Sequence, residues 1–305
     1  MKSLRESLLD DDLVAKTDKI IKAEIEAFLK ENYKGSIEIS KEPNKDGKYE
    51  VSSTSDVEVI NKNIISLTNG MFIWTAAGGY FKCSHCNSLK SLEGAPEKVG
   101  GDFDCSYCNS LKLLEGAPKK VEKSFYCSMC DYLESLKGAP EKVGGDFNCC
   151  YCDSLNSLEG APKEVKRDFY CSVCPSLKSL EGAPKEVGRD FYCSKCIHLE
   201  SLKSAPDKVG GDFCCNNCDS LTSLEGAPKK VGEDFSCVSC RSLKTLKGTP
   251  QMINGCFRCL MCNSLKSLEG APKEVGGDFS CYGCAGKFTR KDIKKVSRVR
   301  GEIKC

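Results

Sequence analysis

Apolar and polar positions recur with a fixed period along most of this chain. A 22-residue unit, approximately F-x-C-S-x-C-x-S-L-x-S-L-E-G-A-P-K-x-V-G-G-D, occurs ten times without a slip in spacing. In the second unit, Phe103 and Cys105 alternate with a polar residue, which predicts a short strand with one buried face. Leu111 and Leu114 return to the interior, and the Gly-Ala-Pro at 116–118 turns the chain. One unit cannot bury these side chains alone, so the pattern predicts a repeat solenoid in which coils stack.

The first 56 residues do not repeat and predict a small N-terminal α/β cap. Thr17 is a suitable N-cap for a helix over about 17–33, whose apolar residues fall on one face. Alternating runs at 36–40 and 48–53 flank a turn-rich loop, which predicts a hairpin. Together these elements are expected to cover the first edge of the stack, because an open edge invites strand addition.

Residues 57–80 have the pattern of a degenerate capping repeat ahead of the ten full repeats at 81–286. Subtracting the period places Asn61 and Ile64 where the two cysteines of a full unit stand. An atypical terminal coil is what a solenoid needs at its end.

The tail, 287–305, breaks the period. Thr289 and Asp292 have capping-box spacing, which predicts a short helix through about Val299. The tail holds eight Lys or Arg and two acidic residues. It is interpreted as a basic C-terminal cap over the last coil; a docking surface for RNA or an acidic partner is the alternative, although nucleic-acid binding is not favoured.

Overall charge gives no sign of a polyanionic partner, because 45 Lys and Arg balance 43 Asp and Glu. Three consecutive aspartates at 10–12 interrupt the region where a signal peptide needs an apolar run. No apolar run approaches the roughly 20 residues of a membrane helix. The sequence therefore predicts a cytoplasmic protein with no membrane partner and with reduced thiols.

The 24 cysteines admit three interpretations: core packing, a Cys-x-x-Cys metal array, or disulfides. The spacing C-x2-C-x18-C-x2-C suits zinc, so adjacent units could supply four thiolates (Cys83, Cys86, Cys105 and Cys108). Reduced core cysteines without a cofactor are the preferred interpretation, because an isoleucine at a cysteine position fills a core but cannot bind metal. Four cysteines lie outside the two regular columns and are expected to be the exposed thiols: Cys150, Cys214, Cys256 and Cys305.

The order V-x-x-x-F-x-C-x-x-C-x-x-L, as at Val99–Leu111, resembles the leucine-rich repeat segment L-x-x-L-x-L-x-x-C-x-x-L. This resemblance covers about 57–286 and implies a parallel β-sheet with a short irregular convex side. The unit is also similar to the F-x-C-S-x-x-x-L-x-S-L-E-G-A-P-K-x-V-G-G repeats of uncharacterised gut-bacterial and bacteriophage proteins. That second resemblance implies provenance, in the host cytoplasm or a virion, and no mechanism.

Two positions per unit vary while the core positions stay nearly constant. They are the residue after the Phe and the residue before the second Cys, and both are expected on the concave strand face. Tyrosines gather there in the second to sixth units, and such residues are favoured at interfaces. The predicted binding residues are Tyr107, Tyr126, Met129, Tyr151, Tyr170, Tyr192 and Arg258. Ordinary cross-strand packing is the alternative explanation of the tyrosines.

An aspartate precedes the Phe in seven of the ten units. It is interpreted as capping amides of its own Gly-Gly turn, with an acidic rim for a basic partner as the alternative. Catalytic signatures such as G-x-S-x-G, a P-loop or H-E-x-x-H are absent from the sequence, which predicts no enzyme. The sequence favours a non-catalytic scaffold that binds a protein through its concave face.

Overall fold

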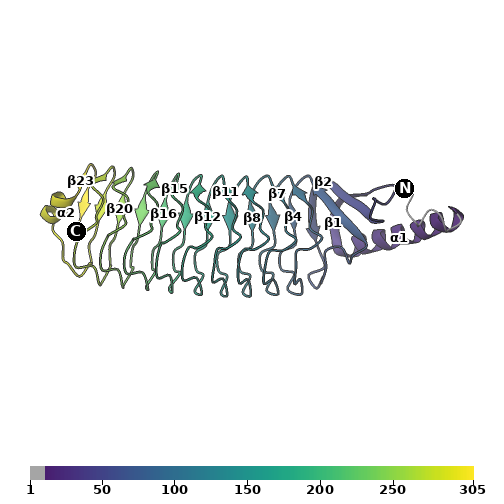
Figure 1. Cartoon of the computed structure of the whole chain (residues 1–305), viewed down its shortest axis with the longest axis horizontal. Coiled ribbons are helices and arrows are strands. Elements are labelled where there is room, and N and C mark those ends of the chain that lie inside the picture. Colours follow the sequence, from purple (N-terminus) through teal and green to yellow (C-terminus); the bar gives the residue numbers. More distant parts are fainter. Residues whose placement is uncertain (1–10) are drawn as a thin grey trace.

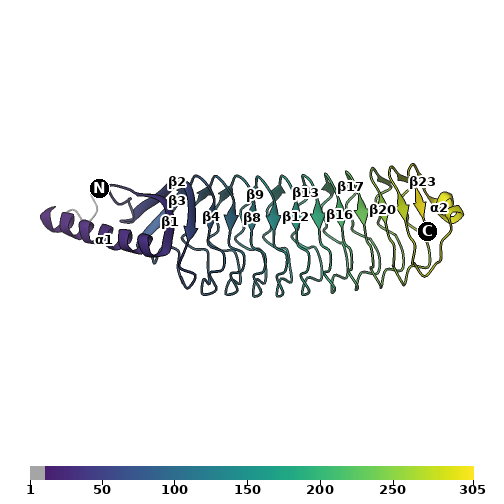
Figure 2. The same ribbon diagram turned by 180° about the vertical axis from the view of Figure 1, so that it is seen from behind.

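The structure, a computed structural model, describes residues 11–305, with side chains from residue 15 onward. It is a parallel β-solenoid whose coils stack along one axis, with a helix and hairpin at one end and a short helix at the other (Figures 1 and 2). The predicted repeat architecture is confirmed by the strand pairing.

Each coil contributes two short strands to two parallel ladders. The first ladder holds the Phe-x strands, which pair in register from coil to coil. Its members are β4 (Phe81–Lys82), β6 (Phe103–Asp104), β8 (Phe125–Tyr126), β10 (Phe147–Asn148), β12 (Phe169–Tyr170), β14 (Phe191–Tyr192), β16 (Phe213–Cys214), β18 (Phe235–Ser236), β20 (Phe257–Arg258), β22 (Phe279–Ser280) and β24 (Ile303–Lys304).

The second ladder lies on the segment that the sequence had left irregular. There the two residues at the Lys-Val position pair with their equivalents in the adjacent coil. Its members are β5 (Lys98–Val99), β7 (Lys120–Val121), β9 (Lys142–Val143), β11 (Glu164–Val165), β13 (Glu186–Val187), β15 (Lys208–Val209), β17 (Lys230–Val231), β19 (Met252–Ile253), β21 (Glu274–Val275) and β23 (Arg298–Val299). The last three form a separate three-stranded sheet.

The core is a set of continuous columns that run the length of the stack. Successive phenylalanine rings, from Phe81 to Phe279, have centroids 5.0–5.8 Å apart. Columns of Cys, Leu and Val adjoin them, and most of these side chains are completely buried. This burial supplies the stabilisation that no single coil could provide.

The N-terminal cap starts with α1 (Asp11–Asn32), which begins six residues before the predicted N-cap, Thr17. The predicted hairpin is present as β1 (Tyr33–Ile39) and β2 (Tyr49–Val59), paired antiparallel.

Strand β2 also continues into the first coil, where it pairs parallel with β3 (Phe72–Ala77) and β4. Phe81 pairs with Val57, an offset of 24 residues rather than 22. Val59 therefore stands in the first cysteine column, and the assignment of Asn61 to that column was wrong. The substitution at this cysteine position is still apolar and fully buried.

The tail forms one more coil. Helix α2 (Arg290–Val296) has the predicted capping box between Thr289 and Asp292, but it ends three residues before Val299. Arg298–Val299 instead becomes β23, and Ile303 pairs with Phe279. The chain leaves the helix there because strand pairing with the preceding coil satisfies its backbone groups.

Candidate binding face

The residues that follow each phenylalanine form a column on the first ladder, called the strand column, which is half-buried apart from the buried Ser236 and Ser280. Four of the predicted binding residues, Tyr126, Tyr170, Tyr192 and Arg258, lie in this column. Tyr170 and Tyr192 are adjacent, with parallel rings whose centroids are 5.2 Å apart. Tyr126 lies two coils away, beyond Asn148.

The tyrosine hydroxyls are held by carboxylates of their own coils. Tyr170 donates to Asp168 Oδ2 at 2.9 Å, and Tyr192 donates to Asp190 Oδ2 at 3.0 Å. Partial burial and then this carboxylate raise the pKa of each phenol, so both remain protonated donors. The hydrogen bonds therefore hold both rings in fixed orientations.

The second variable position does not lie on a strand, contrary to the expectation from the sequence. All ten residues before the second Cys have a positive φ of 55–71° and form the turn that ends the strand. Their side chains consequently point outward: Tyr107 is 40% exposed and Tyr151 is 48% exposed. Met129 lies between them in the same turn column. His85 and Tyr107 stack with ring centroids 4.2 Å apart.

The aspartate column is a ladder between coils, and the prediction that each aspartate caps its own turn was wrong. Oδ1 of each aspartate accepts a hydrogen bond from the backbone N–H one coil further on, at 2.6–3.2 Å. Asp168, for example, accepts from Asp190 N at 3.0 Å. The carboxylates therefore satisfy edge amides where the chain turns between the two ladders.

Sequence reasoning missed a set of basic residues beside the tyrosines. Lys123, Arg167 and Arg189 occupy the place of the second glycine in the Gly-Gly turn, three residues before Tyr126, Tyr170 and Tyr192. Arg167 Nε lies 3.5 Å from Asp146 Oδ1, and Arg189 Nε lies 3.8 Å from Asp168 Oδ1. Aligning the ten units would have shown that a basic residue and a tyrosine occur together in these three coils.

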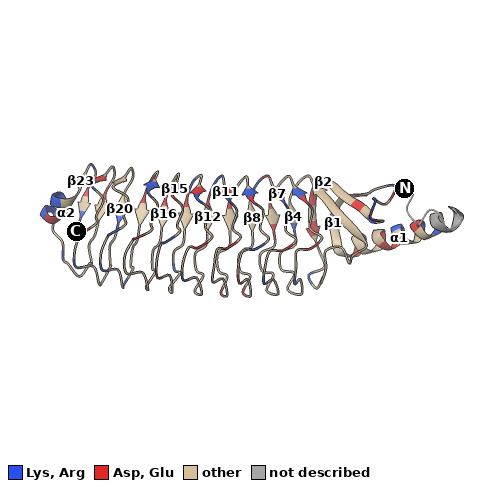
Figure 3. Cartoon of the chain, in the orientation of Figure 1, with Lys and Arg blue, Asp and Glu red and all other residues tan. Residues whose placement is uncertain are grey.

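Arg258 is engaged within the protein. Its guanidinium donates to Asp234 Oδ2 at 2.5 Å, so part of its charge is already neutralised. Elsewhere basic and acidic residues are intermixed along the stack, and neither kind forms a large separate patch (Figure 3). Cross-coil ion pairs such as Lys142–Glu164 at 3.1 Å lie on the surface and contribute little stability each.

The two cysteine columns point inward. From Cys108 onward, each second-column thiol donates to the carbonyl of the first-column cysteine in the preceding coil, with Sγ to O distances of 3.0–3.3 Å. Cys108, for instance, donates to the carbonyl of Cys83. Burial raises the pKa of first-column thiols such as Cys105 and Cys171 well above its ordinary value.

All 24 cysteines are free. Within residues 11–305, no three His, Cys, Asp or Glu side chains are arranged to hold a metal ion, the Cys83, Cys86, Cys105 and Cys108 set included. Of the four cysteines expected to be exposed, Cys305 is exposed, Cys214 and Cys256 are half-buried, and Cys150 is buried. Cys150 replaces a small serine beside the strand, and its Sγ accepts from Ser172 N at 3.2 Å.

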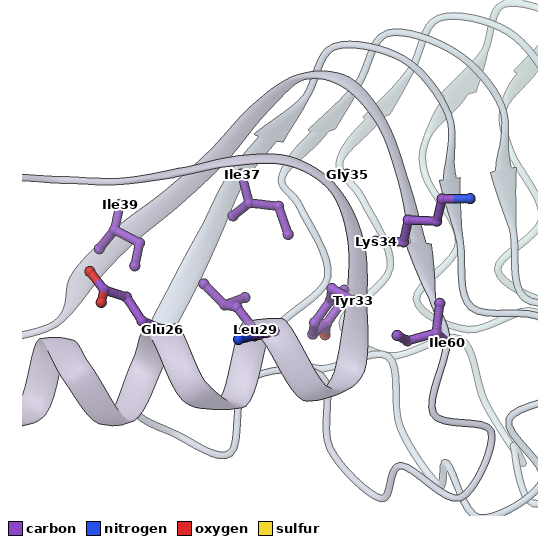
Figure 4. A pocket seen from close by; sticks show the side chains of 9 residues that line it. Glu26, Leu29, Tyr33, Lys34, Gly35, Ile37, Ile39 and Ile60 are labelled. Atoms are coloured by element: carbon purple, nitrogen blue, oxygen red, sulfur yellow. The ribbon is translucent and has the colours of Figure 1, made fainter.

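Two of the surface hollows among the described residues concern the N-terminal cap and the strand column. A pocket of about 510 Å³ separates α1 from β1, where Ile37 and Ile39 face the helix beside Leu29 (Figure 4). A second hollow of about 400 Å³ lies on the strand column around Tyr126 and Ser124.

Some basic residues of the tail form ion pairs within the protein, as Lys304 does with Asp278 at 2.7 Å.

No protein-family model matches the sequence, and no curated protein matches it. Among solved structures, a leucine-rich repeat protein from Bacteroides ovatus ATCC 8483 is similar over 88% of this chain and 98% of that chain, with 14% identity and a TM-score of 0.28. The solenoid fold follows from the in-register pairing of strands between coils. Among the described residues, no helix is long and apolar enough to span a membrane.

Proposed function

We propose that this protein is a non-catalytic scaffold that binds another protein through the strand column of its third to sixth coils. One observation carries the proposal: Tyr126, Tyr170 and Tyr192 stand on an outward face of otherwise uniform coils, each beside a basic residue. Tyr and Arg are the residues that contribute most binding energy at protein interfaces.

The surrounding structure supports the same interpretation. The rings of Tyr170 and Tyr192 are oriented by hydrogen bonds, and the neighbouring turn column adds Tyr107, Met129 and Tyr151. Rigid aromatic side chains with a polar tip give contact area at low entropic cost. In the bacteriophage setting that the sequence resemblance implies, such a scaffold would serve assembly or interfere with a host factor.

The test is a triple variant in which Tyr126, Tyr170 and Tyr192 are replaced by Ala. Proteins captured by the wild type from a bacterial lysate should be lost, since truncating hot-spot tyrosines costs about 2 kcal/mol or more each. Capture is measured by quantitative mass spectrometry, and folding by circular dichroism.

The matched control is Tyr132→Ala, which truncates a more exposed tyrosine that lies outside both columns. This control should retain every captured protein. If the triple variant folds and captures the same proteins in the same amounts, the binding face has been placed wrongly.

A further inference from the structure

The aspartate ladder is interrupted at the third coil, and the interruption leaves Tyr126 different from the other tyrosines of its column. Ser124 stands where the flanking coils have Asp102 and Asp146. Ser124 continues the ladder, since its N–H donates to Asp102 Oδ1 at 2.8 Å and its Oγ accepts from Asp146 N at 3.1 Å. A serine nevertheless has no second oxygen to correspond to Oδ2 of an aspartate.

That second oxygen is the one that binds tyrosine elsewhere. Asp168 Oδ2 and Asp190 Oδ2 accept from the hydroxyls of Tyr170 and Tyr192 in their own coils. Tyr126 has the same position in its coil, but the acceptor two residues before it is missing. The coil thus keeps the phenol donor and lacks the carboxylate that the equivalent donors bind.

The missing carboxylate leaves a hollow with donors around it. Tyr126, Ser124, Lys123 and Arg167 line the pocket of about 400 Å³, together with the glycines at 144–145 and the two flanking aspartates. Across the described chain, no carboxylate oxygen lies within 4.0 Å of the Lys123 ammonium group. The Ser124 hydroxyl accepts from Asp146 N, so its hydrogen remains available for a further acceptor.

The second break in the aspartate ladder is compensated by a side chain of the protein itself. Cys256 replaces the aspartate there, and Arg258 stands at the tyrosine position of that coil. The Arg258 guanidinium reaches back to Asp234, so that coil needs no outside group. Nothing equivalent fills the gap beside Tyr126 among the described residues.

We propose that the pocket beside Tyr126 binds a carboxylate group of a peptide partner, which completes the ladder from outside. The partner's oxygen would accept from the Tyr126 hydroxyl and pair with Lys123. This inference rests on the proposed function, and it names the chemistry that the binding face recognises at one end.

The flanking carboxylates do not forbid this occupant. The ladder already holds five aspartates in consecutive coils, Asp146 to Asp234, so a carboxylate between two others is compatible with the fold. Asp146 is further compensated by Arg167 and by the N–H of Asp168. A phosphate, with nearly twice the charge, would be repelled more strongly by Asp102 and Asp146, so a carboxylate is favoured.

The first experiment titrates the full chain with sodium acetate at constant ionic strength and follows backbone amide resonances by NMR. Amides of Ser124, Tyr126 and Gly145 should shift saturably with acetate and stay unchanged with acetamide. The variant Ser124→Asp supplies the carboxylate from within, so its acetate affinity should fall at least tenfold while its thermal midpoint stays at or above that of the wild type.

The matched control is Asn148→Asp, which adds the same charge one coil away. Asp104 already shows that an aspartate is accepted at this strand position, with its Oδ1 bonded to Ser106 N as Asn148 Oδ1 is bonded to Cys150 N. Acetate binding should fall less than threefold in this control. Should Ser124→Asp not fold, Lys123→Gln must lower acetate affinity by a comparable factor. The proposal is overturned if the wild type shows no saturable shifts, or if Ser124→Asp shows the same shifts as the wild type.

A competition experiment assigns the source of the carboxylate. Acetyl-Gly-Glu-Gly-amide offers only a side-chain carboxylate, whereas acetyl-Gly-Gly-Gly offers only a chain terminus; displacement of acetate by either supports the proposal and identifies the source. Displacement by neither, or tighter binding of inorganic phosphate than of acetate, overturns it. If lysate capture depends on Tyr170 and Tyr192 but is indifferent to Ser124→Asp, and acetate does not bind, the proposed function stands and this inference falls.

Discussion

Cysteine has two structural roles in this protein, and both depend on its small size. In both columns the thiol fills space in the core and acts as a weak donor: first-column thiols such as Cys149 reach a carbonyl of the next coil, and second-column thiols reach the coil before. Cys174, for example, reaches the carbonyl of Cys149 at 3.3 Å. A residue that combines apolar packing with a weak donor satisfies a carbonyl without bringing a strongly polar group into the core.

Alkylation should separate core from surface thiols. Treated with iodoacetamide at pH 8.5, the native protein is expected to react first at Cys305, which is exposed. Burial raises the pKa of Cys171 far above this pH and raises that of half-buried Cys214 to about 12, so the reactive thiolate is scarce at both. Peptide mapping by mass spectrometry gives the order of labelling.

The control for this experiment is the same reaction in urea, where all 24 cysteines should be modified. Labelling of the core columns in native protein at the rate of Cys305 would contradict the buried assignment.

Residue roles that depend on one coil were open to prediction, and those that depend on two were not. The inward direction of Phe103 and Cys105 follows from alternation along a single strand. The partner of Asp168 is an amide of the next coil, 22 residues later, and no local pattern shows whether a short carboxylate reaches its own turn or its neighbour's. The missing carboxylate beside Tyr126 was equally hard to predict, because it is recognised only when this coil is compared with the coil of Tyr170.

At the scale of the element, the turns carry the strongest backbone requirement. The glycine that opens the turn before the recurring proline has a positive φ in eight coils, for example 90° at Gly182. A Cβ placed on Gly182 would lie 2.4 Å from backbone atoms of the preceding coil. The sixth coil has Ser204 at this position, with φ of 69°, so one turn of the solenoid carries a side chain where the others have none.

This difference predicts opposite effects for two reciprocal substitutions. Ser204→Gly should stabilise the protein by about 1 kcal/mol, because it removes a side chain from a conformation that glycine adopts freely. Gly182→Ser should destabilise it by about 1–3 kcal/mol, through the same strain and the close approach of the preceding coil. Urea midpoints measured by circular dichroism would show the two shifts.

The double variant Gly182→Ser/Ser204→Gly serves as a control, since it keeps the composition of the wild type. Its midpoint should fall between those of the two single variants. Equal midpoints for both single variants would mean that the turns tolerate side chains and that the positive φ carries no cost.

Element boundaries were predicted well only where the signal was local. The capping box of Thr289 and Asp292 set the start of α2 correctly, because all of its hydrogen bonds lie within four residues. Its end, and the two-residue strands β23 and β24, are set by pairing with β21 and β22, which lie more than 20 residues earlier. The 24-residue offset between Val57 and Phe81 was likewise invisible to a rule that assumed 22.

At the scale of the whole molecule, each coil lies mainly against its two neighbours (Figure 1). The same columns of buried side chains continue from coil to coil. Stability in such a stack is approximately a sum of coil and interface contributions. A condition that affects one column therefore acts on every coil at once, and its effects accumulate along the axis.

Alkaline pH is such a condition. Burial raises the pKa of first-column thiols such as Cys127, Cys149 and Cys171 above the value of about 9 expected in the unfolded chain. Above pH 9 the unfolded chain releases protons that the folded chain retains, so stability is intact below pH 9 and falls as the pH rises. Each such thiol contributes a loss of about 1.4 kcal/mol per pH unit, and the column holds one thiol in each of ten coils. We expect thermal midpoints measured with a phosphine reductant to be nearly constant from pH 7 to 8.5 and to drop steeply by pH 10.

The size of that drop should scale with the number of buried thiols, which separates this effect from the titration of surface lysines. The variant Cys149→Ala/Cys171→Ala should have a lower midpoint at every pH, because it loses two buried side chains. Its free energy of unfolding should fall less steeply with pH, because unfolding releases about two fewer protons. Unfolding free energies from urea titrations at pH 8, 9 and 10 give both slopes. Parallel slopes would show that the cysteine columns do not set the alkaline limit, and a flat profile to pH 10 would show that they are not buried as thiols.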